Sequence, residues 1–244
     1  MKSNIAFWNI LLKDMRNYYL KPPNISWGII FPFAWMLMMF VKTKTTFNIE
    51  EVFPGIVAMS ILFGTTSMLS VTITFERKSR SFERLLAAPI RIEWLIMAKI
   101  SGAIFFGIFN SIVPVLFSVL YFKAVVANWA VLVIGIILLS IISTLLGLFI
   151  SVSAKEVFEA QTYSNFFRFP MIFLCGLFIP LSTLPTFIQP FSYILPVTYG
   201  VDLLNYSISG SNSISVIIDV VLIFSFCILL FYISIFNIKR KWII

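Results

Sequence analysis

Residues 124–154, AVVANWAVLVIGIILLSIISTLLGLFISVSA, contain no Lys, Arg, Asp or Glu. An α-helix rises about 1.5 Å per residue and the hydrocarbon core of a bilayer is about 30 Å thick, so about 20 apolar residues suffice to cross it. Five further charge-free runs are long enough or nearly so: residues 22–41, 52–75, 100–122, 169–201 and 220–238. Because 60% of the residues are hydrophobic and only 11% are charged, the sequence predicts an all-α polytopic membrane protein with six transmembrane helices.

The distribution of Lys and Arg predicts the orientation of these helices, because such residues favour cytoplasmic loops. Fifteen of the 18 lie in the N-terminal segment, in the gap at 76–99, beside the gap between the fourth and fifth helices (Lys155 and Arg168), and in the C-terminal tail. Both termini are therefore predicted to be cytoplasmic, in a multi-pass protein of the cytoplasmic (inner) membrane. Arg168 is expected to snorkel to the cytoplasmic interface.

The net charge of +8 is explained by this topology together with contact between the protein and anionic membrane lipid. No nucleic-acid partner is expected, because the basic residues are not gathered in a soluble domain. At the N-terminus, apolar side chains recur at helical spacing over residues 3–20, which is typical of an amphipathic interfacial helix on the inner leaflet. Pro22 and Pro23 then end that helix. Whether it is only an anchor or has a further role is left open.

The gap at 76–99 contains a short helical pattern, with Phe82, Leu85 and Leu86 on one face and Pro89 as its stop. A solvent-facing helix with an apolar face needs something to cover that face. Two covers are equally compatible with the spacing: the membrane surface, and a groove on a soluble partner subunit.

The run at 169–201 is too long for one ordinary crossing, and it contains five of the 11 prolines. We expect a fifth transmembrane helix at about 166–182, followed by a proline-rich outer re-entrant helical hairpin before the sixth. Non-helical backbone at membrane depth is tolerated only when it is buried in protein or lines a wet cavity. The hairpin therefore either helps to close an outward exit or is plain outer-loop packing.

Chemical motifs of enzymes are missing from the sequence. It has no GxxxxGK[ST] phosphate-binding loop, no histidine, and only two cysteines, which are far apart. We therefore expect no catalytic, cofactor-binding or metal site on this chain. Polar residues inside the predicted helices, Thr66, Ser70 and Asn110, suggest either helix packing or a lining for a transport pathway.

Two stretches resemble one known family. Glu76 and Arg77 followed by FERLLAAPIRIEWLIMAKI (82–100) resemble the cytoplasmic loop of permease subunits of the type 2 ABC exporters. The later stretch GLFIPLSTLPTFIQPFSYILPVTYGVDLLN (176–205) resembles that family's region ending in a Pro-x-Thr/Ser-Tyr motif, here Pro196, Thr198 and Tyr199. The resemblance covers essentially the whole chain and is closest to the drug-exporter branch that includes daunorubicin permeases.

The resemblance implies a half-transporter. Two copies, or this chain and a paralogue, would pair as a dimer, and each would bind a separate ABC ATPase subunit that holds ATP and Mg. A coupling helix after the second span would contact the ATPase, and the proline-rich hairpin would form an outer gate. The implied coupling residues are Glu76, Arg80, Phe82, Glu83, Arg84, Leu85, Leu86 and Pro89, and the implied gate residues are Pro180, Pro185, Pro196 and Tyr199. The implied substrate is a small amphiphilic or lipid-like molecule that is exported.

These expectations make the chain a single transmembrane permease domain. Its predicted parts are an interfacial connecting helix (1–21), spans one and two (22–75), a coupling segment (76–99), spans three to five (100–184), the outer hairpin (185–214), and span six with a cytoplasmic tail (215–244). A permease that exports lipid-linked polysaccharide or glycolipid is the main alternative. An integral membrane enzyme acting on lipids is the alternative from another class, and the lack of histidine and of clustered intramembrane acids speaks against it.

Overall fold

A computed structural model describes residues 2–19, 26–42, 49–87, 91–210 and 214–242. The described part of the chain has ten α-helices, two short π-helical segments and one 3-10 turn. In chain order these are α1 (Lys2–Asp14), η1 (Met15–Tyr19), η2 (Ser26–Ile30), α3 (Phe31–Lys42), α4 (Ile49–Lys78), α5 (Ser81–Leu86), α6 (Ile92–Leu120), α7 (Trp129–Ser153), α8 (Val157–Leu174), η3 (Leu181–Thr183), α9 (Gln189–Ile194), α10 (Val197–Ser209) and α11 (Val216–Trp242).

Four of the described helices, α4, α6, α7 and α11, are long and apolar enough to cross a membrane. The predicted all-helical class is therefore confirmed, and each of these helices contains or nearly matches one of the predicted charge-free runs. The two other predicted crossings correspond to smaller helices. Segments η2 and α3 together cover only 26–42, and α8 is 18 residues long and includes Glu159 and Arg168.

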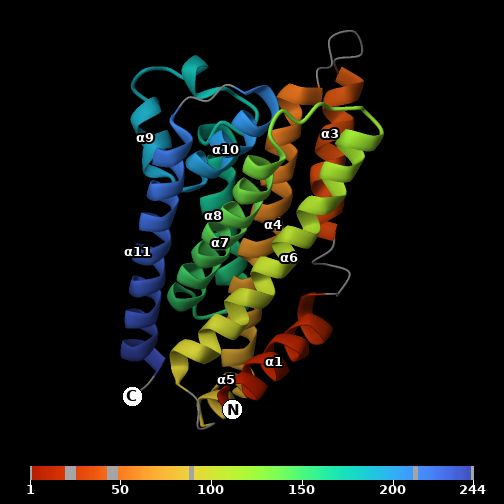
Figure 1. Ribbon diagram of the computed structural model, residues 1–244. Helices are drawn as coiled ribbons and strands as arrows, with labels where there is room; N and C mark the ends of the chain where they lie inside the picture. The colour runs from red at the N-terminus through yellow and green to blue at the C-terminus, as the bar shows by residue number, and fades with distance from the viewer. Residues whose placement is uncertain (1, 20–25, 43–48, 88–90, 211–213, 243–244) are drawn as a thin grey trace.

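Helix α4 is the centre of the bundle, where it contacts α6, α7, α8 and α10. It packs tightly against α7 at Gly147, where an added Cβ would lie 2.7 Å from the carbonyl oxygen of Thr66. Glycine is therefore required for this approach of two backbones. Figure 1 shows both termini, α1 and α5 at one end of the bundle, and α9 and α10 at the other. We call these the α5 end and the α9 end.

The fifth predicted crossing is displaced from its expected place. Helix α8 ends at Leu174, whereas the sequence predicted a helix at about 166–182. Pro170 lies inside α8 and does not end it; the break comes at Gly176, whose φ of 80° is a left-handed conformation that favours glycine. After the break the chain forms η3, α9 and α10 at the α9 end, and α10 packs against α7, α11 and α4.

Candidate coupling site

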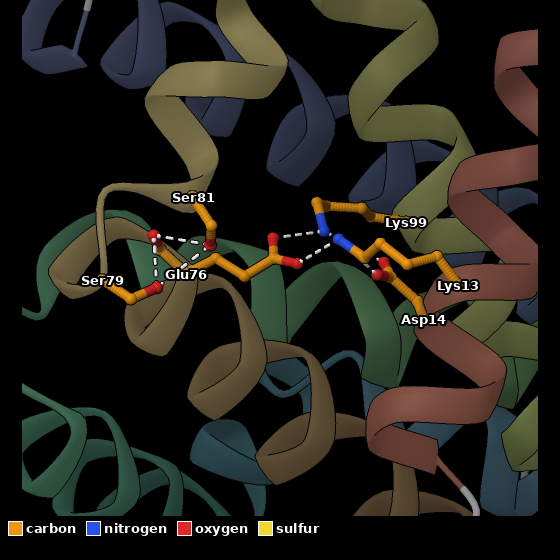
Figure 2. A network of polar contacts seen from close by, with 6 residues as sticks. All are labelled: Lys13, Asp14, Glu76, Ser79, Ser81 and Lys99. Carbon is orange, nitrogen blue, oxygen red and sulfur yellow. Dashed lines mark hydrogen bonds and ion pairs between the residues drawn. The ribbon is translucent and has the colours of Figure 1, made fainter.

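A buried network of charges joins three helices at the α5 end (Figure 2). The Lys99 Nζ atom of α6 lies 2.9 Å from Asp14 Oδ2 of α1 and 2.5 Å from Glu76 Oε2 of α4. The Lys13 Nζ atom of α1 lies 2.7 Å from Glu76 Oε1 and 3.2 Å from Asp14 Oδ1. Glu76 thus forms ion pairs with both lysines, and these connect the end of α4 to α1 and α6 at the same point.

The charges within this network balance, because two ammonium groups face two carboxylates. Glu76 and Lys99 are fully buried and Asp14 nearly so, while Lys13 is partly exposed. Burial alone would lower the pKa of Lys13, but the carboxylates of Glu76 and Asp14 outweigh it and hold that pKa above its ordinary value of 10.5. Lys13 is therefore charged at neutral pH. A buried set of this kind is costly to break, because any member left alone becomes an uncompensated buried charge.

The same glutamate organises the turn that leads into α5. Its backbone carbonyl accepts hydrogen bonds from the hydroxyls of Ser79 and Ser81, each at 3.2 Å, and the two hydroxyls lie 3.0 Å apart. Arg80 between them has a left-handed φ of 55°, which reverses the chain so that α5 can begin at Ser81. Figure 2 shows the lysines on the side-chain side of Glu76 and the two serines on its backbone side. The position of α5 thus depends directly on that of Glu76.

Helix α5 is seated on the protein itself. Phe82 is 1% exposed and belongs to the hydrophobic core, and Leu85 is half-buried against it. The bundle's own side chains therefore cover Phe82 and part of Leu85. Glu83 and Arg84 are exposed, as is Arg80. The side chain of Leu86 and all of Pro89 lie outside the described part of the chain.

The end of α4 is also tied to the next two helices. The Arg77 Nη1 atom donates to the carbonyl oxygens of Ser151 and Ala154, at 3.4 and 3.1 Å, where α7 ends. A cation at a helix C-terminus satisfies carbonyl groups that have no partner in the helix. Lys78 forms an exposed ion pair with Glu156, just before α8. The α4–α5 turn thus has polar contacts with α1, α6, the end of α7 and the residue before α8.

The predicted gate residues fall into two groups at the α9 end. Pro196 and Tyr199 are buried where α9 meets α10, and the Tyr199 hydroxyl donates to the carbonyl oxygen of Tyr193 at 2.5 Å. Pro180 and Pro185 flank η3 on an exposed stretch of chain. The described contacts therefore join Tyr199 to α9, but they give Pro180 and Pro185 no direct contact with Tyr199.

The three predicted pathway residues lie at helix–helix contacts. The Thr66 hydroxyl donates to the carbonyl oxygen of Ser143 in α7 at 3.2 Å. The hydroxyl of Ser70 lies 2.8 Å from that of Ser164 in α8. The side-chain amide of Asn110 in α6 is buried against Gly28 and Gly64, and within the described chain its nitrogen and oxygen have no hydrogen-bond partner.

Sequence reasoning missed Lys13, Asp14 and Lys99 as members of a site. They come from segments up to 85 residues apart, and nothing in their local patterns marks them as partners. The only available signal was that Lys99 follows an apolar run and immediately precedes another. Arg168 was also misplaced: it is 1% exposed inside the bundle and does not reach the interface.

A helical bundle with several apolar crossings, no phosphate-binding loop and a charged network beneath a short end helix has the features of a transport subunit. The family model of the ABC-2 type transporters matches residues 5–209, so this chain belongs to the ABC-2 type transporter family. It is a permease, a transport component without a catalytic role, and membership in this family implies a partner ATPase subunit.

Two relatives illustrate the similarity. The inner membrane transport permease YadH of Escherichia coli strain K12 is 26% identical over 187 residues, which cover 77% of this chain and 71% of YadH. The probable multidrug ABC transporter permease YbhS of the same strain is 24% identical over 209 residues, which cover 82% of this chain and 55% of YbhS.

Proposed function

We propose that this chain is the permease subunit of an ABC exporter of the drug-exporter branch, and that it moves a small amphiphilic or lipid-like molecule outward across the cytoplasmic membrane. A separate ATPase subunit would bind ATP and Mg, and this chain would bind neither. The similarity to YbhS, which is named a probable multidrug permease, supports the branch.

The proposed topology has six crossings, with both termini in the cytoplasm. Helices α4, α6, α7 and α11 would supply four, and the segment η2–α3 and α8 the other two. The termini and α5 lie at the same end of the bundle (Figure 1), as an even number of crossings requires. The strong excess of Lys and Arg in segments at this end supports a cytoplasmic α5 end. Two such permeases would pair as a dimer.

In this proposal α5 is the coupling helix. The main support is the geometry of Glu76, whose carboxylate is held by Lys13 and Lys99 while its backbone oxygen holds the turn that begins α5. A push on α5 by the ATPase would therefore act on α1, α4 and α6 together. Exposed Glu83 and Arg84 would contact the ATPase, and buried Phe82 would transmit the force into the core.

The proposed outer gate is the segment from η3 to α10. It has exposed apolar side chains, among them Phe187, Phe191 and Ile194, which suit contact with the outer leaflet or with the second permease. Tyr199 would hold α9 to α10 while the gate is closed. The gated pathway must bind its substrate less well once it faces outward, because equal affinity for both states would not drive export.

The test is charge reversal on the exposed face of α5. We expect Arg84→Glu to leave insertion unchanged and to reduce permease-stimulated ATP hydrolysis by the co-expressed ATPase about tenfold, the usual size of a lost charge pair at an interface. Lys241→Glu is the matched control, since it reverses an exposed charge at the same end but outside α5. Normal stimulation and normal co-purification of the Arg84→Glu permease would refute the assignment of α5.

A further inference from the structure

Arg168 is a fully buried cation in α8, with 1% of its surface exposed. Its guanidinium carbon lies 4.3 Å from the centre of the Phe63 ring in α4. Its nitrogens donate to the carbonyl oxygens of Ser164 at 3.1 Å and Phe63 at 3.4 Å, and to Asn165 Oδ1 at 2.5 Å. The acceptors and the ring are all electrically neutral.

The depth of this charge in the bundle makes it unusual. Phe63 lies at the middle of α4, which runs from Ile49 to Lys78, so it is roughly 21 Å from either end of that helix at about 1.5 Å per residue. An Arg at this depth cannot reach water by extending its side chain. Ionisable residues inside a membrane bundle are expensive, and they mark ligand or ion pathways more often than packing.

Among the described residues, the other fully buried cation is paired with carboxylates and Arg168 is not. Lys99 faces both Asp14 and Glu76, whereas no carboxylate in the described part of the chain forms an ion pair with Arg168. A guanidinium has five N–H groups arranged to fit a carboxylate or phosphate. Three hydrogen bonds leave two of these N–H groups without an acceptor among the described residues.

The surface beside Arg168 is suited to a hydrocarbon chain. Phe166, Phe169 and Phe173 follow one another at intervals of three and four residues on α8, so they form one face, and all three are exposed. Phe169 is in edge contact with Phe63, at 6.3 Å between ring centres, and Phe63 in turn covers the guanidinium. The cation and an apolar surface therefore lie one aromatic ring apart.

We propose that Arg168 binds the anionic head group, a carboxylate or phosphate, of an amphiphile whose hydrocarbon tail lies on the aromatic face of α8. The head group reaches the guanidinium when α4 and α8 separate at Phe63, on the side of the hydrogen bond between Ser70 and Ser164 that faces the α9 end. The anion supplies the missing negative charge and takes up the two unused N–H groups. As a statement of substrate class, this inference rests on the proposed export function.

The test is direct binding to the purified full chain in nanodiscs of phosphatidylcholine, without the ATPase. Hexadecyl phosphate and hexadecanol share one tail and differ in the charge of the head, so their comparison isolates the head group. We expect wild type to prefer hexadecyl phosphate, and Arg168→Gln to weaken that binding roughly 10- to 100-fold, as the loss of charge-assisted hydrogen bonds implies. Hexadecanol binding should not change.

Two variants control for charge and for shape. Arg168→Lys keeps the charge but loses the planar fork, so its affinity should fall between those of wild type and Arg168→Gln. Arg240→Gln removes an exposed cation at the α5 end and should bind as wild type does.

Competition by phosphatidylglycerol in the nanodisc would identify the bound anion as a membrane lipid, and its failure to compete would identify an added amphiphile as the ligand.

Equal binding of the phosphate and the alcohol by wild type overturns the inference, even if the Arg168 variants do not fold. A monodisperse Arg168→Gln protein with wild-type affinity for hexadecyl phosphate also overturns it. Because this assay uses no ATPase, its failure leaves the coupling role of α5 intact, and a failed Arg84→Glu experiment leaves the binding result intact.

Discussion

Replacing Glu76 by Gln is expected to destabilise the whole α5 end of the bundle. Wild type balances the charges of Lys13 and Lys99 against those of Asp14 and Glu76. The neutral amide leaves this buried cluster with a net positive charge. The amide also has one acceptor oxygen in place of the two that face Lys13 and Lys99, so one of these lysines would meet an NH2 donor.

The magnitude follows from this burial. Removing one partner of a buried ion pair costs about 3–5 kcal/mol, because the other charge stays desolvated. For a protein of this size, 1 kcal/mol corresponds to about 2–4 °C in the midpoint of thermal unfolding, so the midpoint should fall by about 6–20 °C. The matched control is Glu156→Gln, which breaks the exposed pair with Lys78 and should cost about 1 kcal/mol or less.

The assay is thermal unfolding of the detergent-purified permeases, with the fraction of monodisperse protein measured after heating. The double variant Glu76→Gln with Lys99→Met should recover much of the lost stability, because it removes a cation along with its partner. A midpoint for Glu76→Gln that matches that of Glu156→Gln would refute the reasoning. So would a double variant less stable than Glu76→Gln alone.

Two further changes test the seating of α5 and the joint between α9 and α10. Phe82→Ala should cost about 3–5 kcal/mol, measured by the same thermal assay, because the ring is fully buried; an equal loss in the exposed variant Glu83→Ala would contradict this. Tyr199→Phe should cost about 0.5–1.5 kcal/mol and speed proteolysis between α9 and α10, because the carbonyl of Tyr193 loses its donor. If Tyr193→Phe, which keeps that bond, has the same effect, the hydrogen bond is not the cause.

The bounds of a helix could be predicted from its apolar run where tertiary contacts did not let the helix extend beyond that run. The run at 124–154 became α7 at Trp129–Ser153, and its start is set by Asn128, whose side chain accepts a hydrogen bond from the Val131 amide. The helix predicted from the run at 100–122 was less accurate, because α6 begins at Ile92. The charge of Lys99 was taken as a boundary, but lysine does not end a helix, and its pairing with Asp14 and Glu76 allows it to be buried within α6.

The candidate coupling site was predictable only in part. The turn after α4 and the short helix that follows were found from Phe82, Leu85 and the nearby charges. The burial of Phe82 was not, because periodicity shows which face of a helix is apolar but not what covers it. The burial of Arg168 was missed for a related reason. The sequence shows how far Arg168 lies from the start of the apolar run at 169–201, but it does not show how α8 packs on α4.

The amino-acid sequence by itself determined that this is a helical membrane protein, because long charge-free runs and a one-sided distribution of Lys and Arg act through solvation, which each segment experiences locally. The resemblance to ABC-2 permeases came from the stretches at 82–100 and 176–205, which are also local. Only the tertiary structure decided that Lys13, Asp14, Glu76 and Lys99 share one site, and that Arg168 forms no ion pair with a carboxylate of the described residues. Coulomb interactions depend on distance in space. The packing of α1, α4, α6 and α8 sets those distances, and sequence separation does not.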